Sequence, residues 1–236
     1  MKRLLFGVIF VSTAGMAIGN AMQISDTPLD ISGITAVTIS GEASSVDITT
    51  APDAPYRATI KRHRSGWFAQ WYSGWAYDDC SASSRMWIEG SLLRIDVGIW
   101  TWFGVSDCRY DINLNVKKQT AVTIDQQALR AGLTGDFSAV TIAAKAGDII
   151  VSGHADTVSL KGDALRVGLT LKTTAQNEVV TVDARMLEAD LDFTAAPALA
   201  YSVTAKAAFV DSARISTPGA RPLLTIAGDF VHATIR

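Results

Sequence analysis

The residues best suited to acid–base chemistry are three carboxylates that alternate along one short segment. Glu188, Asp190 and Asp192 occupy every second position, and Arg166 lies about one repeat earlier. Two facing carboxylates can serve as general acid and general base in glycoside cleavage. Alternate residues of a strand share one face, so we interpret the three as the solvated face of an amphipathic strand. A polysaccharide-acting β-helix enzyme is the distant alternative.

Other catalytic patterns are missing from the sequence. The three histidines, His63, His154 and His232, lack ligand spacing to each other, so no metal site is expected. The chain contains no nucleophile-elbow serine, phosphate loop or dinucleotide fingerprint. We therefore expect no enzyme activity, no catalytic residue and no cofactor.

A tryptophan-rich insert is the strongest candidate for binding. All six tryptophans fall within one 36-residue stretch. Their aromatic faces could stack on sugar rings or fill a partner's pocket, or they could form a cap over the end of a repeat domain. The insert or cap spans residues 63–108, and its candidate ligand-binding residues are Trp67, Trp71, Trp75, Trp100 and Trp102.

Two cysteines, Cys80 and Cys108, lie in the same insert. In an exported protein a disulfide between them is the default expectation, and two separate thiols are the alternative. Such a bond would contribute about 3–4 kcal/mol to stability.

The rest of the chain must form the scaffold that holds this insert, and it is repetitive. The tetrapeptide Ala-Val-Thr-Ile begins at Ala36, Ala121 and Ala139, and related segments begin at Thr157, Val179, Ala200 and Leu223. The intervals counted from Ala121 are 18, 18, 22, 21 and 23 residues. Apolar and hydroxyl side chains alternate in each copy, which indicates strands with Val and Ile inward and Thr or Ser outward.

Short periods of this kind predict stacked units. We expect an all-β fold, a parallel β-solenoid (β-helix) of 18–23-residue coils in which equivalent residues stack. An antiparallel β-sandwich or meander is the alternative, but it gives no reason for residues one period apart to match.

The N-terminal residues and the net charge limit where the protein can be located and which partners it can have. Lys2 and Arg3, an apolar run and a small-residue cleavage site make residues 1–21 a secretory signal peptide. We expect the remaining residues 22–236 to form one exported β-solenoid domain with no membrane span, in the periplasm or at the cell surface of a bacterium. Without residues 1–21 the chain has 19 basic and 23 acidic residues, a net charge of −4, which argues against nucleic acid as a partner.

The order of these features resembles a known family. Residues 31–41 read Ile-Ser-Gly-Ile-Thr-Ala-Val-Thr-Ile-Ser-Gly, followed by Val-Asp-Ile at 46–48, an extended segment at 56–61 and a strand at 93–96. With the Gly-Asp-punctuated repeats, this is similar to the bacterial "putative auto-transporter adhesin, head GIN domain" family and its adhesin-like β-strand-repeat relatives of unknown function. The resemblance covers most of the chain from about residue 30. It implies a right-handed solenoid, export to the cell envelope and adhesin-like or scaffolding roles, and it supplies no catalytic residues.

The sequence thus favours a non-enzymatic protein that acts through surface contacts at the cell envelope, with an envelope protein or a glycan as partner. A carbohydrate-binding protein that uses the tryptophan insert is the alternative. The oligomeric state is not predicted.

Overall fold

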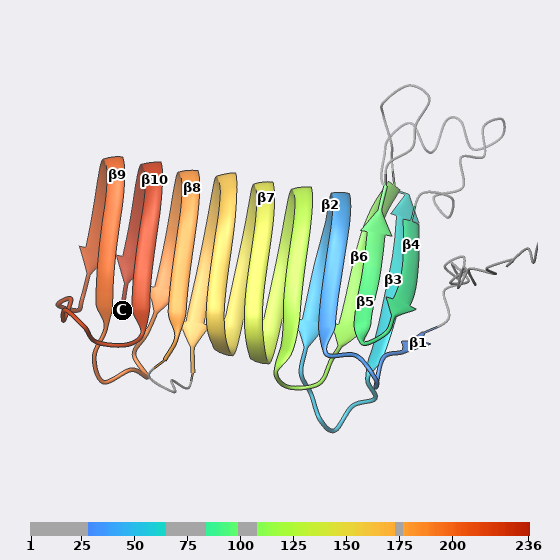
Figure 1. Ribbon diagram of the computed structural model, residues 1–236. Helices are drawn as coiled ribbons and strands as arrows, with labels where there is room; N and C mark the ends of the chain where they lie inside the picture. Colours follow the sequence, from blue (N-terminus) through green and yellow to red (C-terminus); the bar gives the residue numbers. More distant parts are fainter. Residues whose placement is uncertain (1–27, 65–83, 99–107, 173–176) are drawn as a thin grey trace, which may run out of the picture.

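Strands make up every regular element in the part of the chain that the structure describes. The structure is a computed structural model that describes residues 28–64, 84–98, 108–172 and 177–236 (Figure 1). Within these ranges no helix occurs, as the alternation of apolar and polar residues predicts. The strands are β1 (Leu29–Asp30), β2 (Ala36–Thr49), β3 (Arg57–Arg64), β4 (Ser84–Glu89), β5 (Leu92–Val97), β6 (Cys108–Asn115), β7 (Thr120–Leu171), β8 (Val179–Asp192), β9 (Ala200–Ser212) and β10 (Leu223–Ile235).

The strands form one ten-stranded sheet in the order β1-β3-β6-β2-β7-β8-β10-β9, with β5 pairing with both β2 and β4. The pairs from β2 to β9 are parallel. Antiparallel pairs occur at the N-terminal end, where β3 joins β1 and β6 and where β4 joins β5. Parallel pairing of the repeats is therefore confirmed, and the repeat region does not form an antiparallel meander.

Equivalent residues of the repeats stack on one another. The first two Ala-Val-Thr-Ile copies pair residue for residue, so that Ala36 lies opposite Ala121 and Ile39 opposite Ile124. Val180 of β8 lies between Val158 of β7 and Leu224 of β10. The register is therefore set by which residues enter the core, because a slip of one residue would turn every apolar side chain outward.

Strand β7 is too long to run straight. Its 52 residues would span about 170 Å if fully extended, and Figure 1 shows its ribbon turning back repeatedly between β2 and β8. β2 pairs with residues 121–134, whereas β8 pairs with residues 157–170. A Cβ added to Gly153 would lie 2.0 Å from the carbonyl oxygen of Gly135. Residues 18 apart are thus backbone neighbours.

The last two strands are not stacked in chain order. β9 is the outermost strand, and β10, which follows it in sequence, lies between β8 and β9. In β8 and β10 the inward residues Val182 and Ile226 are fully buried, whereas Val203 of β9 is only half-buried. The C-terminal strand β10 therefore lies inside the sheet, and β9 forms the edge of the sheet.

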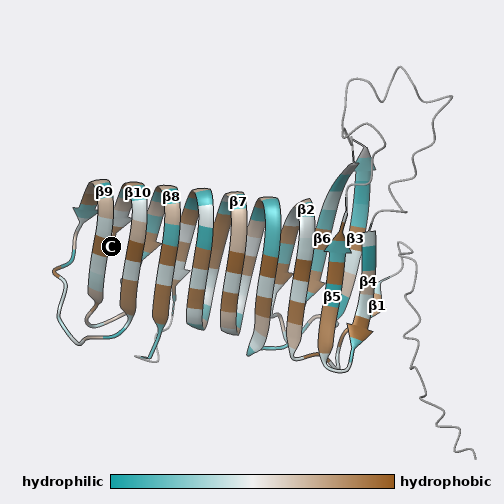
Figure 2. Ribbon diagram, turned by 45° about the horizontal axis from the view of Figure 1, so that its top comes forward, coloured by the Kyte–Doolittle hydropathy of each residue, from teal (hydrophilic) through white to brown (hydrophobic). Residues whose placement is uncertain are grey.

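The core is a set of stacked aliphatic rows. Figure 2 shows each strand as alternating hydrophobic and hydrophilic segments. Val37, Val122, Val158 and Val180 are at most 1% exposed, and the threonines that follow Val37 and Val122 face outward. Among the described residues, three large aromatic side chains complete the core: Tyr110, Phe137 and Phe193.

Candidate functional site

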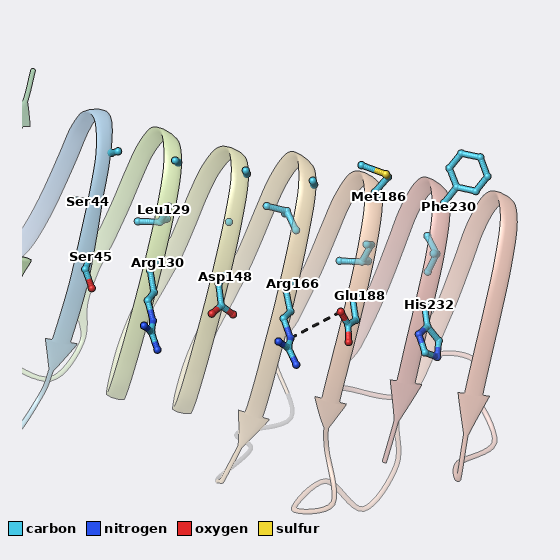
Figure 3. A pocket seen from close by; sticks show the side chains of 18 of the residues that line it. Ser44, Ser45, Leu129, Arg130, Asp148, Arg166, Met186, Glu188, Phe230 and His232 are labelled. Carbon is cyan, nitrogen blue, oxygen red and sulfur yellow. Dashed lines mark ion pairs between the residues drawn. The ribbon is translucent and has the colours of Figure 1, made fainter. Parts of the chain in front are cut away.

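A groove of about 1250 Å³ runs across the strands on the outer face of the sheet. It crosses neighbouring passages of the chain, which we call lanes (Figure 3). In spatial order the lanes are residues 43–45 of β2, residues 128–130, 146–148 and 164–166 of β7, residues 186–188 of β8, residues 230–232 of β10 and residues 207–209 of β9. The groove therefore extends across seven lanes, and neighbouring strands lie about 4.8 Å apart.

The first residue of a lane is small in most lanes. It is alanine at 43, 128, 146, 164 and 207, and it is large only at Met186 and Phe230. The second residue points into the core in four lanes, where Leu129, Leu165, Leu187 and Val231 are at most 5% exposed. Small side chains next to an inward-pointing residue leave the surface hollow, which forms the groove.

The third residue of each lane points outward and is charged in the middle of the groove. Four successive lanes carry Arg130, Asp148, Arg166 and Glu188, which we call the groove row (Figure 3). The Arg166 Nε atom lies 4.0 Å from Glu188 Oε2, and the two side chains are 71% and 63% exposed. Because both side chains are more than half exposed, most of their hydrogen-bonding capacity is open to solvent. Exposed pairs of this kind contribute about 0–1 kcal/mol each.

A second row of alternating charge lies beside the groove, at the residue before each of the last five lanes. This outer row is Lys145, Asp163, Arg185, Asp229 and Lys206. Its side chains pair along the stack, with Arg185 Nη1 3.8 Å from Asp163 Oδ1 and Lys206 Nζ 2.8 Å from Asp229 Oδ1. Alternation in both rows avoids like charges in adjacent lanes, which would repel across the short strand spacing.

One end of the groove is apolar and exposed. Met186, Phe230 and Phe209 are 57%, 63% and 66% exposed, and they come from the adjacent strands β8, β10 and β9. The rings of Phe209 and His232 are 5.3 Å apart in an edge-to-face arrangement. Clustered exposed apolar side chains mark contact surfaces more often than single ones do.

A polar pair that is partly buried lies at the other end of the groove. The Ser44 hydroxyl donates a hydrogen bond to Gln126 Oε1 at 2.9 Å, and Gln126 is 2% exposed. Its Nε2 atom has no hydrogen-bond partner among the described residues. This pair occupies positions at which later lanes carry aliphatic residues or glycine.

The candidate carboxylates share a face but contact different partners. Glu188 faces Arg166, as the sequence suggests, whereas Asp190 pairs with Arg236. The backbone N–H of Thr194 donates to Asp192 Oδ1 at 2.9 Å, and this bond lowers the pKa of Asp192 below its ordinary value. The three groups therefore act as separate surface charges, and within the described ranges no group of three or more potential ligands could hold a metal ion.

The tryptophan insert lies mostly outside the described residues. Trp67, Trp71, Trp75, Trp100, Trp102 and Cys80 all fall there. Trp87 is half-buried on β4 opposite Arg94, and Cys108 begins β6 opposite Arg64. Ligand binding by the tryptophan-rich insert and the disulfide between Cys80 and Cys108 stay predictions. In the described part of the chain no helix is long and apolar enough to cross a membrane.

The groove was not predicted from the sequence. Its signal lies in residues 18, 22 or 44 positions apart, as between Asp148, Arg166, Glu188 and His232. It becomes visible only when the repeats are aligned and read across the lanes.

Comparison with known proteins adds little information about function. No protein-family model and no curated protein matches the chain. A "putative cell adhesion protein" from Clostridium sporogenes aligns over 86% of this chain and 93% of its own, with 8% identity and a TM-score of 0.43. A "putative adhesin" from Bacteroides fragilis aligns over 89% and 94%, with 9% identity and a TM-score of 0.34. Another "putative adhesin", from Parabacteroides merdae, aligns over 92% and 98%, with 8% identity and a TM-score of 0.35. At such scores the function has to be argued from the chain's own surface.

Proposed function

We propose that the protein is an exported, adhesin-like β-solenoid that acts by surface contact and performs no catalysis. The exposed apolar cluster of Met186, Phe209 and Phe230 at one end of the groove is the observation that carries this proposal. Three large apolar side chains on adjacent strands are costly to leave in water, and a contact surface gives a reason to keep them there.

The solenoid architecture is supported by the register. Residues 18 apart are backbone neighbours at Gly135 and Gly153, and Gly162 approaches the carbonyl oxygen of Ala144 at the same spacing. Each coil then covers 18–23 residues. We assign a right-handed turn, because connections between parallel strands of one sheet are right-handed in about 98% of cases.

Export is supported by the sequence at residues 1–21, with its two basic residues and apolar run. The presence of two cysteines in the part that would be exported suits an oxidising compartment. We therefore place the mature chain in the periplasm or at the cell surface.

An adhesion assay tests the contact function. Beads coated with residues 22–236 are mixed with cells of the bacterium that encodes the protein, and bound beads per cell are counted. Phe230→Ser should reduce binding, whereas the matched control Ile215→Ser should not, because Ile215 is 91% exposed but lies outside the groove. Equal binding by both variants and the wild type would remove the groove from the contact surface. Beads that bind neither cells nor each other would contradict the adhesin-like role.

A further inference from the structure

We propose that the groove binds a second copy of this chain. The lanes of the two copies run in opposite order, and the copies are related by a two-fold axis that passes between Asp148 and Arg166. The inference rests on the proposed function, in which the groove is the contact surface. It adds the identity of the partner, and it follows from the order of charges and side-chain sizes across the lanes.

The charges of the groove row are self-complementary under this symmetry. Reversing the order Arg130, Asp148, Arg166, Glu188 places an opposite charge at every position. Arg130 faces Glu188 of the second copy, and Asp148 faces Arg166 of the second copy. A two-fold interface uses the same patch on both chains, so each of these contacts occurs twice.

The sizes of the first residues are also complementary. From β2 to β10 these residues are Ala43, Ala128, Ala146, Ala164, Met186 and Phe230. When the order is reversed, Met186 faces Ala128 of the second copy and Phe230 faces Ala43. Each large side chain thus meets a small one, and the lane of β9 extends beyond the paired region.

Stacking within one chain explains only part of this pattern. Alternating charge relieves repulsion between adjacent lanes, and the outer row shows the same alternation away from the groove. Stacking gives no reason for Met186 and Phe230 to be more than half exposed. It also leaves Arg166 and Glu188 mostly open to solvent, at a separation of 4.0 Å, so both can pair across an interface.

The expected association of one pair of molecules is weak. Exposed ion pairs stabilise little individually, and the apolar part consists of a few side chains. Many copies on one surface act together, however, because each contact raises the effective concentration for the next. Weak self-recognition is therefore sufficient for adhesion between two coated surfaces.

A charge exchange tests the proposal. Asp148→Arg places like charges at the two middle contacts of a symmetric pair, and Arg166→Asp does the same with negative charge. Each variant alone should associate with itself at least tenfold more weakly than the wild type in analytical ultracentrifugation. Mixed in equal amounts, the two variants meet with opposite charges at both middle contacts, and association should return to the wild-type level.

The outer row supplies matched controls. Asp163→Arg puts an arginine between Lys145 and Arg185, just as Asp148→Arg puts one between Arg130 and Arg166. Arg185→Asp is the matching control for Arg166→Asp. These variants carry the same repulsion within the chain but lie outside the groove, so they should associate like the wild type.

Several results would overturn the inference. They are a wild-type chain that stays monomeric at the highest soluble concentration, a mixture of the two variants that does not recover association, or outer-row controls that lose association equally.

Far-UV circular dichroism checks that each variant is folded, and a variant that fails this check is replaced by a salt titration of the wild type. Added salt should weaken self-association, and an unchanged dissociation constant would contradict the charge pairing. Wild-type beads that bind cells but do not clump refute the second-copy partner and leave the contact function intact, whereas beads that do neither refute both.

Discussion

Replacing Gly153 by alanine is the most direct test of the stacked backbone. Gly153 has φ +130°, and an added Cβ would lie 2.0 Å from the Gly135 carbonyl oxygen. A backbone conformation reserved for glycine costs about 1–3 kcal/mol for another residue, and overpacking a tight site costs about 1–3 kcal/mol more. We expect Gly153→Ala to lower the free energy of unfolding by about 3 kcal/mol or more.

Two other glycines separate the backbone effect from the close approach. Gly90 has φ +61° but nothing within 4 Å of an added Cβ, so Gly90→Ala should cost about 1–2 kcal/mol. Gly33 has nothing within 4 Å and no left-handed φ, so Gly33→Ala should change stability by less than about 1 kcal/mol. Urea unfolding followed by far-UV circular dichroism measures all three. If Gly153→Ala and Gly90→Ala differ by less than about 1 kcal/mol, residues 18 apart are not in contact and the stacking argument fails.

Other perturbations address the end of the sheet, a surface carboxylate and the predicted disulfide. Deleting residues 223–236 removes β10, the strand that pairs with β9, so β9 amides should exchange with solvent at unfolded rates while β8 amides stay protected; protected β9 amides would contradict the strand order. Asp192→Ala removes the acceptor of the Thr194 N–H. Because this hydrogen bond lowers the pKa of Asp192 in the folded protein, its stabilisation is present above the unfolded pKa of about 3.9 and is lost as the pH falls through the lower folded value. Urea midpoints of wild type and variant should therefore differ near neutral pH and converge in strong acid, and a constant difference would exclude this origin. Cys80→Ser should lower the free energy of unfolding by about 3–4 kcal/mol under oxidising conditions, and an equal wild type and variant would exclude the disulfide.

The register of the repeats was predictable because it depends on local pattern. Val37, Val122 and Val180 each lie one residue into a repeat, and each must enter the core if its neighbours are to face outward. An error of one residue would bury threonine and expose valine. The starting points of the repeats at Ala36, Ala121, Thr157, Val179, Ala200 and Leu223 are accordingly the residues that lie opposite one another across strand pairs.

The first part of the sheet could not be predicted in the same way. There β2 pairs with two short strands, β5 along its first half and β6 along its second, and both of these have antiparallel partners. The sequence of this region is interrupted by the tryptophan-rich insert, so no repeat marks the pairing. β4 and β5 form a local hairpin across Gly90 and Ser91, whereas the antiparallel pairs of β3 join segments far apart in the sequence, for which single-sequence patterns carry no signal.

The position of β10 shows why the groove was missed as well. β10 pairs in register with both β8 and β9, so the register alone does not determine which of β9 and β10 lies at the edge. The core therefore specifies register without specifying lane order. The charge and shape of the surface do depend on that order, because each outward side chain has as its neighbours the side chains of the adjacent lanes. Phe230 stands beside Met186, and His232 beside Glu188, only because the last strand is placed inside β9. The apolar end of the groove is thus a consequence of strand order, and it is the part of the site that reading the repeats in sequence cannot reveal.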